Sequence, residues 1–187
     1  MCVIRFYLLN NMAESAVVLA HTFPSHPLSN SVLRTLTVSP TSASPHLPPS
    51  WLAGFTLLTL GSVLRYASYC YLGTLYTFRL SIRDAHHLVT SGPYAHVRHP
   101  GYLGAILTLA GVGTCTFGPG SLLHDGGWLA TRAGAALGAT LVLGMGMMVR
   151  MVVARVPVED AVLRREFGQE WERWARRVPY ALIPGIY

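Results

Sequence analysis

The sequence has 187 residues, of which 51% are hydrophobic and 12% are charged. Soluble domains carry about twice this share of charged residues, and a single chain of this length could not bury so much apolar surface. The composition therefore indicates an integral membrane protein. The formal net charge of +6 comes without a basic stripe interleaved with aromatic residues, which argues against a nucleic-acid partner and favours the anionic headgroups of a lipid bilayer.

The first 50 residues look unlike the rest of the chain. Two short apolar pieces, at residues 3–9 and 16–20, are separated by polar residues, so they lack the unbroken apolar core of a signal peptide, and a partial membrane segment fits equally well. Residues 21–50 are rich in Ser, Thr and Pro. This composition predicts a flexible linker ahead of a membrane domain at residues 51–187.

Three apolar stretches predict membrane spans at about residues 51–78, 101–117 and 128–153. The first contains one charge, Arg65. Either this side chain faces protein or a water-filled cavity, or the helix ends near Leu64 and the arginine reaches the interface. Four glycines in the third span are spaced for close helix packing. They are Gly134, Gly138, Gly144 and Gly146. The fold class predicted is an all-α, polytopic integral membrane helical bundle.

Arginines predict the topology. The turn between the second and third spans has none, whereas residues 79–98 and the segment from Arg150 onward hold ten. By the positive-inside rule, these two segments face the cytosol. The tail at residues 154–187 is predicted to continue as helix past Pro157 and to form a second, amphipathic helix that ends at Val178-Pro179. Its Trp171 and Trp174 are candidate interface anchors.

The polar stretch from His86 to Gly104 carries four of the eight histidines and runs directly into the second span. Pro100 suits the first turn of a helix, and the free N–H groups and dipole of that turn predict a site for a carboxylate or phosphate. His96 and His99 are spaced like a metal-binding pair, but no cysteine or acidic residue completes a site, so no metal is expected.

Arg155 and Glu159 are four residues apart and share one face of a continuous helix. From the spacing alone, an ordinary surface ion pair is an adequate explanation.

The run Leu88-Val89-Thr90-Ser91-Gly92-Pro93-Tyr94, followed by Arg98-His99-Pro100-Gly101-Tyr102-Leu103-Gly104, closely resembles the signature of the isoprenylcysteine carboxyl methyltransferases. Further matching positions lie on both sides. They are Leu64-Arg65, Gly73, Glu159-Asp160, Phe167-Gly168, Arg177-Val178-Pro179 and Pro184. The resemblance covers about residues 51–187.

This resemblance implies a membrane enzyme that uses S-adenosyl-L-methionine to methylate the C-terminal prenylated cysteine of processed CaaX proteins. It also implies residence in the endoplasmic reticulum membrane, with the active site and the helical tail on the cytosolic side. Two alternatives stay open: a phospholipid or other small-lipid methyltransferase of the same fold group, and a non-catalytic membrane protein that retains the fold.

The resemblance also assigns roles to individual residues. Arg155 matches the position that engages the prenylcysteine carboxylate, and Glu159 matches a cofactor contact. Leu88 and Val89 would pack on the adenine or offer backbone groups, and the tyrosines would present flat faces to a cation. The complete set of cofactor contacts implied is His86, His87, Leu88, Val89, Tyr94, His99, Pro100, Gly101, Tyr102 and Glu159.

Overall fold

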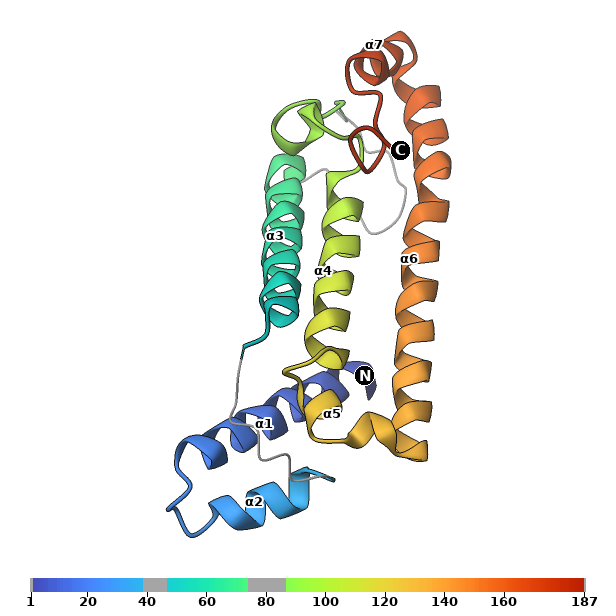
Figure 1. The fold of residues 1–187 in the computed structure, drawn as a ribbon. Coiled ribbons are helices and arrows are strands. Elements are labelled where there is room, and N and C mark those ends of the chain that lie inside the picture. The colour runs from blue at the N-terminus through green and yellow to red at the C-terminus, as the bar shows by residue number, and fades with distance from the viewer. Residues whose placement is uncertain (1, 39–46, 74–86, 187) are drawn as a thin grey trace. The chain divides into compact units, whose positions relative to one another are not determined.

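The computed structural model describes residues 2–38, 47–73 and 87–186. All regular secondary structure in these residues is helical, which confirms the all-α prediction (Figure 1). The chain forms two compact units. The first consists of Met1–Thr56 and Gly111–Gly144, and the second of Leu57–Ala110 and Met145–Tyr187.

Two helical stretches among the described residues, Pro100–Asp125 and Arg132–Phe167, are long and apolar enough to cross a membrane. Their most apolar parts are only 22% and 6% buried, as expected of helices that face lipid rather than the core of a soluble protein. Helix α3 (Pro49–Leu72) occupies most of the predicted first span, residues 51–78. It is not among the two stretches that are apolar enough to cross a membrane, because polar residues interrupt its apolar sequence. Residues 74–78 of that prediction lie outside the described residues.

Helix α3 continues well past Leu64, so the alternative in which it ends there is wrong. The guanidinium of Arg65 lies 5.3 Å from the centroid of the Tyr69 ring. A ring face attracts a cation electrostatically, so this contact stabilises a charge within an otherwise apolar helix.

The first unit contains more structure than the sequence predicts. Helix α1 (Cys2–Thr22) is followed by α2 (Ser29–Leu36), which lies inside the segment predicted to be a flexible linker. Long-range hydrogen bonds hold the end of α2: the indole N–H of Trp128 donates to the carbonyl of Leu36 at 2.8 Å, and the Val38 N–H donates to the carbonyl of Gly126 at 2.8 Å. Composition alone does not reveal such tertiary bonds.

Local signals explain the helix boundaries that follow. Helix α4 (Pro100–Phe117) begins at its proline and ends before Gly118-Pro119-Gly120, as predicted. The predicted turn after it contains a short helix, α5 (Leu122–Asp125). Helix α6 (Arg132–Phe167) begins later than predicted, because the Thr131 hydroxyl accepts the N–H of Gly134 at 2.9 Å and caps the helix there.

Helix α6 has 36 residues and passes through Pro157 without a break. At 1.5 Å per residue it is roughly 54 Å long, whereas the hydrocarbon core of a bilayer is about 30 Å thick. If α6 spans a membrane, its charged C-terminal part therefore extends beyond the apolar layer.

In the second unit, α3 and α4 touch through their backbones at two glycines. A Cβ atom added to Gly104 would lie 2.7 Å from the carbonyl oxygen of Gly61, and one added to Gly61 would lie 2.5 Å from the nitrogen of Thr108. Close helix packing was predicted instead for glycines of the third span. The described residues show no such packing at Gly144 and Gly146, where an added Cβ would meet none of their atoms within 4 Å.

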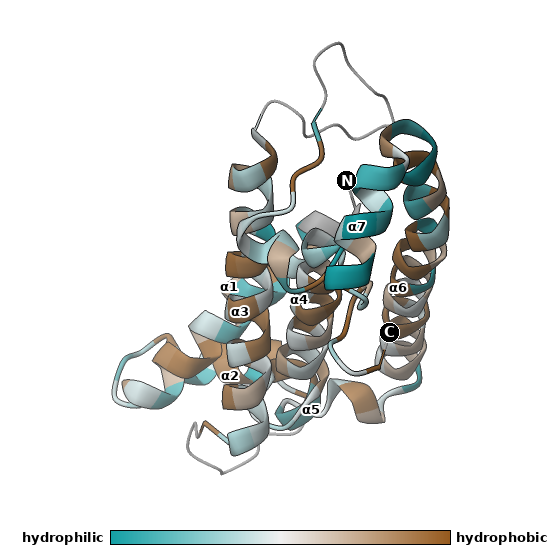
Figure 2. Ribbon diagram, turned by 90° about the horizontal axis from the view of Figure 1, so that it is seen from above, coloured by the Kyte–Doolittle hydropathy of each residue, from teal (hydrophilic) through white to brown (hydrophobic). Residues whose placement is uncertain are grey.

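Helix α7 (Gln169–Arg177) follows α6 after a break at Gly168, which has a positive φ of 48°. It is the predicted amphipathic helix, and Figure 2 shows it in teal along much of its length. Trp174 is only 2% exposed and packs against Leu88 and Val178. Its prediction as an interface anchor is therefore wrong, since the ring fills a small apolar core and its indole N–H donates to the carbonyl of Tyr94 at 3.1 Å.

Replacing Trp174 by phenylalanine is expected to destabilise the protein by about 1 kcal/mol more than replacing Trp171 by phenylalanine. Both changes remove the same atoms from α7. Only Trp174 donates to a carbonyl, whereas the buried indole nitrogen of Trp171 has no acceptor among the described residues. Thermal unfolding of the two variants in detergent measures the difference, and equal losses would contradict the role given to the hydrogen bond.

Candidate functional site

The site begins at the first turn of α4, in the second unit. The rings of His99 and Tyr102 are three residues apart and stack, with centroids 5.5 Å apart and planes 9° from parallel. His99 is buried, with 5% of its surface exposed. Ahead of it, the short 3₁₀ helix η2 (Gly92–Ala95) leads the chain into α4, and Gly92 has a φ of 59° that favours glycine.

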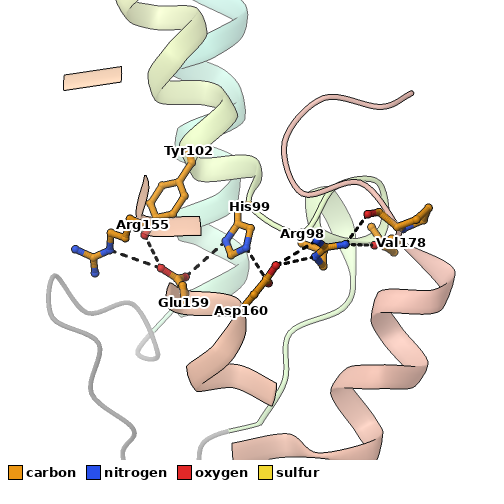
Figure 3. A network of polar contacts seen from close by, with 8 residues as sticks. Arg98, His99, Tyr102, Arg155, Glu159, Asp160 and Val178 are labelled. Atoms are coloured by element: carbon orange, nitrogen blue, oxygen red, sulfur yellow. Dashed lines mark hydrogen bonds and ion pairs between the residues drawn. The ribbon is translucent and has the colours of Figure 1, made fainter. Parts of the chain in front are cut away.

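Helix α6 brings Arg155 and Glu159 to these rings (Figure 3). The Tyr102 hydroxyl donates to Glu159 Oε2, and Arg155 Nε lies 3.7 Å from the same oxygen. His99 Nδ1 lies 3.8 Å from Glu159 Oε1. The continuous helix keeps Arg155 and Glu159 on one face despite Pro157. The structure thus brings together four of the residues singled out in the sequence, His99, Tyr102, Arg155 and Glu159.

Two further residues complete the network, and sequence reasoning assigned neither of them a role. Asp160 Oδ1 lies 3.0 Å from His99 Nε2. Asp160 Oδ2 accepts from Arg98 Nε at 3.3 Å and from Arg98 Nη2 at 3.1 Å. Each is a direct neighbour of a predicted site residue, but their partnership spans 62 positions of sequence, and no local pattern reveals it.

The C-terminal tail is fastened to the start of α4. The backbone N–H groups of Arg98 and His99 donate to the carbonyls of Tyr180 and Ala181 at 3.0 and 2.9 Å. In addition, Arg98 Nη1 donates to the carbonyls of Val178 and Pro179 at 3.1 and 2.6 Å. Ala181 and Leu182 are buried with Val156 against Tyr102 and Ile106. The tail therefore packs directly beside the polar network of His99, Tyr102 and Asp160.

Hydrogen bonds within the chain use most of the N–H donors that were predicted to form an anion site at the start of α4. Tyr102 and Leu103 donate their N–H groups to the carbonyl of His99, and Pro100 has no N–H to offer. Among the described residues, no acceptor is found for the N–H of Gly101. The predicted cluster of free donors is thus largely used within the chain, and Gly101 supplies the N–H that remains.

The other predicted cofactor contacts lie elsewhere in the second unit. Leu88 and Tyr94 pack with Trp174 and Val178, so the side chain of Leu88 is occupied and its backbone is the part left for a ligand. His87 is exposed and Val89 is half-buried. His86 lies outside the described residues, as do Arg79 and Arg83, which entered the topology prediction.

The network has an inner and an outer ion pair. In the inner pair, the side chains of Arg98 and Asp160 are 14% and 15% exposed and make two short contacts. In the outer pair, those of Arg155 and Glu159 are 40% and 26% exposed and lie 3.7 Å apart. A guanidinium can hold a carboxylate with two parallel hydrogen bonds, and a carboxylate can accept from ammonium or hydroxyl groups. The outer pair is therefore suited to a ligand that carries a carboxylate together with an ammonium or hydroxyl group.

Comparisons with known proteins match the part of the chain that contains His99 and Tyr102. Residues 53–117 match the isoprenylcysteine carboxyl methyltransferase family, a region that includes most of α3 and all of α4, with His99 and Tyr102. Arg155 and Glu159 lie beyond it. No solved structure matches the chain significantly.

Curated relatives extend the similarity along the chain. The chain is 31% identical over 139 residues to a protein of Oryza sativa subsp. indica named "Probable protein-S-isoprenylcysteine O-methyltransferase", a match that covers 72% of this chain and 63% of the relative. It is 29% identical over 133 residues to "Protein-S-isoprenylcysteine O-methyltransferase B" of Arabidopsis thaliana, with coverage of 69% and 58%. The matched part is thus less than two thirds of either relative. Residues 53–117 therefore belong to the isoprenylcysteine carboxyl methyltransferase family, and the similarity to relatives named for this activity covers more than two thirds of the chain.

Proposed function

We propose that the chain transfers a methyl group from S-adenosyl-L-methionine to the C-terminal carboxylate of a prenylated cysteine. The observation that carries the proposal is the convergence of Arg155 and Glu159 from α6 on His99, which directly precedes α4, and on Tyr102 in the first turn of α4. These elements are far apart in the sequence, and together they present a cation for a carboxylate beside acceptors for a cationic cofactor.

The nucleophile needs little activation. A C-terminal carboxyl group has a pKa of about 3.5 and is ionised at neutral pH, so the reaction requires no general base. When bound, S-adenosyl-L-methionine supplies the methyl group on an electrophilic sulfonium. The task of the chain is to hold the carboxylate in line and to exclude water. The planar fork of Arg155 is suited to this task because it can bind both carboxylate oxygens.

The donor and acceptor set also fits the cofactor. Glu159 offers carboxylate oxygens to an ammonium or to ribose hydroxyls, and the N–H of Gly101 remains for a carboxylate. The ring of Tyr102, which stacks on His99, is a flat surface of the kind that attracts a cation. Arg155 would instead contact the second substrate, so the two ligands would use different residues of one network.

The same proposal includes a location. α4 and α6 would cross a bilayer, with the site near one face, and the prenyl chain would enter from the lipid between helices. The arginines after position 150 support placing that face toward the cytosol, and the family resemblance supports the endoplasmic reticulum membrane.

A methyl-transfer assay in phospholipid nanodiscs tests the proposal. The protein is given methyl-labelled S-adenosyl-L-methionine with either N-acetyl-S-farnesyl-L-cysteine or phosphatidylethanolamine as acceptor. We expect label in the farnesylcysteine methyl ester, which is identified by its release as methanol in base. Label in the lipid would support the phospholipid methyltransferase alternative. If neither acceptor is labelled although the protein is folded, the proposed activity is wrong.

A further inference from the structure

His99 lies between two carboxylates that make unequal contacts with its ring (Figure 3). Its Nε2 is 3.0 Å from Asp160 Oδ1, whereas its Nδ1 is 3.8 Å from Glu159 Oε1. The first distance is that of a hydrogen bond and the second is too long for one. The side chain of His99 is only 3% exposed, so water reaches little of the ring.

This geometry selects one tautomer of the ring. A carboxylate only accepts hydrogen bonds, so the ring nitrogen that faces Asp160 must carry the hydrogen. A neutral imidazole has one N–H group, and the nitrogen that faces Glu159 is then an acceptor. Two acceptors 3.8 Å apart do not bond to each other, but an N–H or O–H donor placed to one side of the line that joins them can bond to both.

The Asp160 carboxylate is itself held in place. Arg98 donates twice to its Oδ2, which leaves Oδ1 for His99. The same guanidinium donates to the carbonyls of Val178 and Pro179. A charged, hydrogen-bonded pair that is 14% and 15% exposed gives the carboxylate little freedom to rotate, so the hydrogen bond to His99 keeps a fixed direction.

We propose that Asp160 is a positioning residue that fixes the Nε2–H tautomer of His99, so that His99 Nδ1 and Glu159 together accept a donor group of the methyl-donating cofactor, either its ammonium or a ribose hydroxyl. This inference rests on the proposed function for the identity of the ligand. The tautomer and its dependence on Asp160 follow from the network alone.

Replacing Asp160 by asparagine tests the role in cofactor binding. The amide keeps the shape of the side chain, but its NH₂ group can donate to His99 Nε2, which moves the ring hydrogen to Nδ1 and removes the acceptor. We expect KM for S-adenosyl-L-methionine to rise about tenfold, as for the loss of one hydrogen bond to a charged group. KM for N-acetyl-S-farnesyl-L-cysteine should stay within about twofold, since the proposal gives Asp160 no part in holding that substrate.

The matched control is Glu172→Gln. Glu172 accepts twice from Arg164 in an exposed pair of the same type, with a shortest contact of 2.8 Å. Its replacement should leave both KM values unchanged. A variant Asp160→Asn that raises the two KM values equally, or raises neither, contradicts the positioning role.

A spectroscopic measurement keeps the test independent of how well the variant folds. In ¹⁵N-histidine-labelled wild-type protein, the signals of His99, assigned by their loss in His99→Gln, should show a hydrogen on Nε2 and none on Nδ1. Asp160→Asn should reverse this pattern. A hydrogen on Nδ1 in the wild type overturns the inference. Failure of the wild type to bind S-adenosyl-L-methionine, with the Nε2–H signal present, would instead count against the proposed function alone.

Discussion

Replacing Arg155 by alanine is expected to lower kcat/KM for N-acetyl-S-farnesyl-L-cysteine by about 100-fold. Such a loss corresponds to about 2.7 kcal/mol of transition-state stabilisation. The reason is that alanine removes the cation proposed to hold both oxygens of the nucleophile in line with the methyl group. Arg155→Lys should lose about tenfold, because lysine keeps the charge and loses the planar fork. Methyl transfer measured over a range of both substrates gives these values.

The control for Arg155 is Arg164→Ala. Arg164 also lies on α6 and pairs with a glutamate, but its side chain is 64% exposed, and exposed pairs contribute little. Its replacement should leave kcat/KM within about twofold of the wild type. If Arg155→Ala keeps more than a third of wild-type kcat/KM, the carboxylate is held by another group and the proposed assignment fails.

Replacing Gly104 by alanine is expected to destabilise the protein by about 2 kcal/mol or more. The added methyl group would lie 2.7 Å from the carbonyl oxygen of Gly61 and 2.9 Å from the nitrogen of Arg65. These are backbone atoms and cannot rotate away, so α3 and α4 would have to separate. A lower thermal midpoint in detergent is the measurement.

Gly146→Ala is the matched control for Gly104. It makes the same chemical change within helix α6, at a position where an added Cβ meets nothing within 4 Å among the described residues. Alanine has the higher helix propensity by about 1 kcal/mol, so the control should be unchanged or slightly stabilised. Equal destabilisation of the two variants would show that close contact between α3 and α4 is not the cause.

Boundaries set by neighbouring residues could be predicted from the sequence. Pro100 starts α4, and a Gly-Pro-Gly segment ends it, because each acts on the backbone at its own position. The start of α6 was predicted less accurately, because the apolar run begins at Trp128 whereas Thr131 caps the helix three residues later. Helix α2 could not be predicted at all, because its end is held by hydrogen bonds with Gly126, which accepts, and Trp128, which donates.

In the candidate site, too, local sequence signals and tertiary contacts differ in what could be predicted. Arg155 and Glu159 were found through family resemblance, whereas their spacing alone also fits a surface pair. Asp160 and Arg98 were not assigned a role, since each becomes informative only when α6 and the loop before α4 are placed side by side. Trp174 was misassigned for a related reason. A tryptophan on a polar helix suits an interface, and only the tertiary packing shows that Leu88 and Val178 cover it.

The bonding between the start of α4 and residues 178–181 has a consequence for biosynthesis. Arg98 reaches partners about 80 positions further along the chain, so during translation the histidine next to it emerges long before the carbonyl that accepts its N–H. The proposed catalytic geometry can therefore form only after the ribosome has released residue 181. A nascent chain halted before that point should insert its hydrophobic helices without gaining methyltransferase activity.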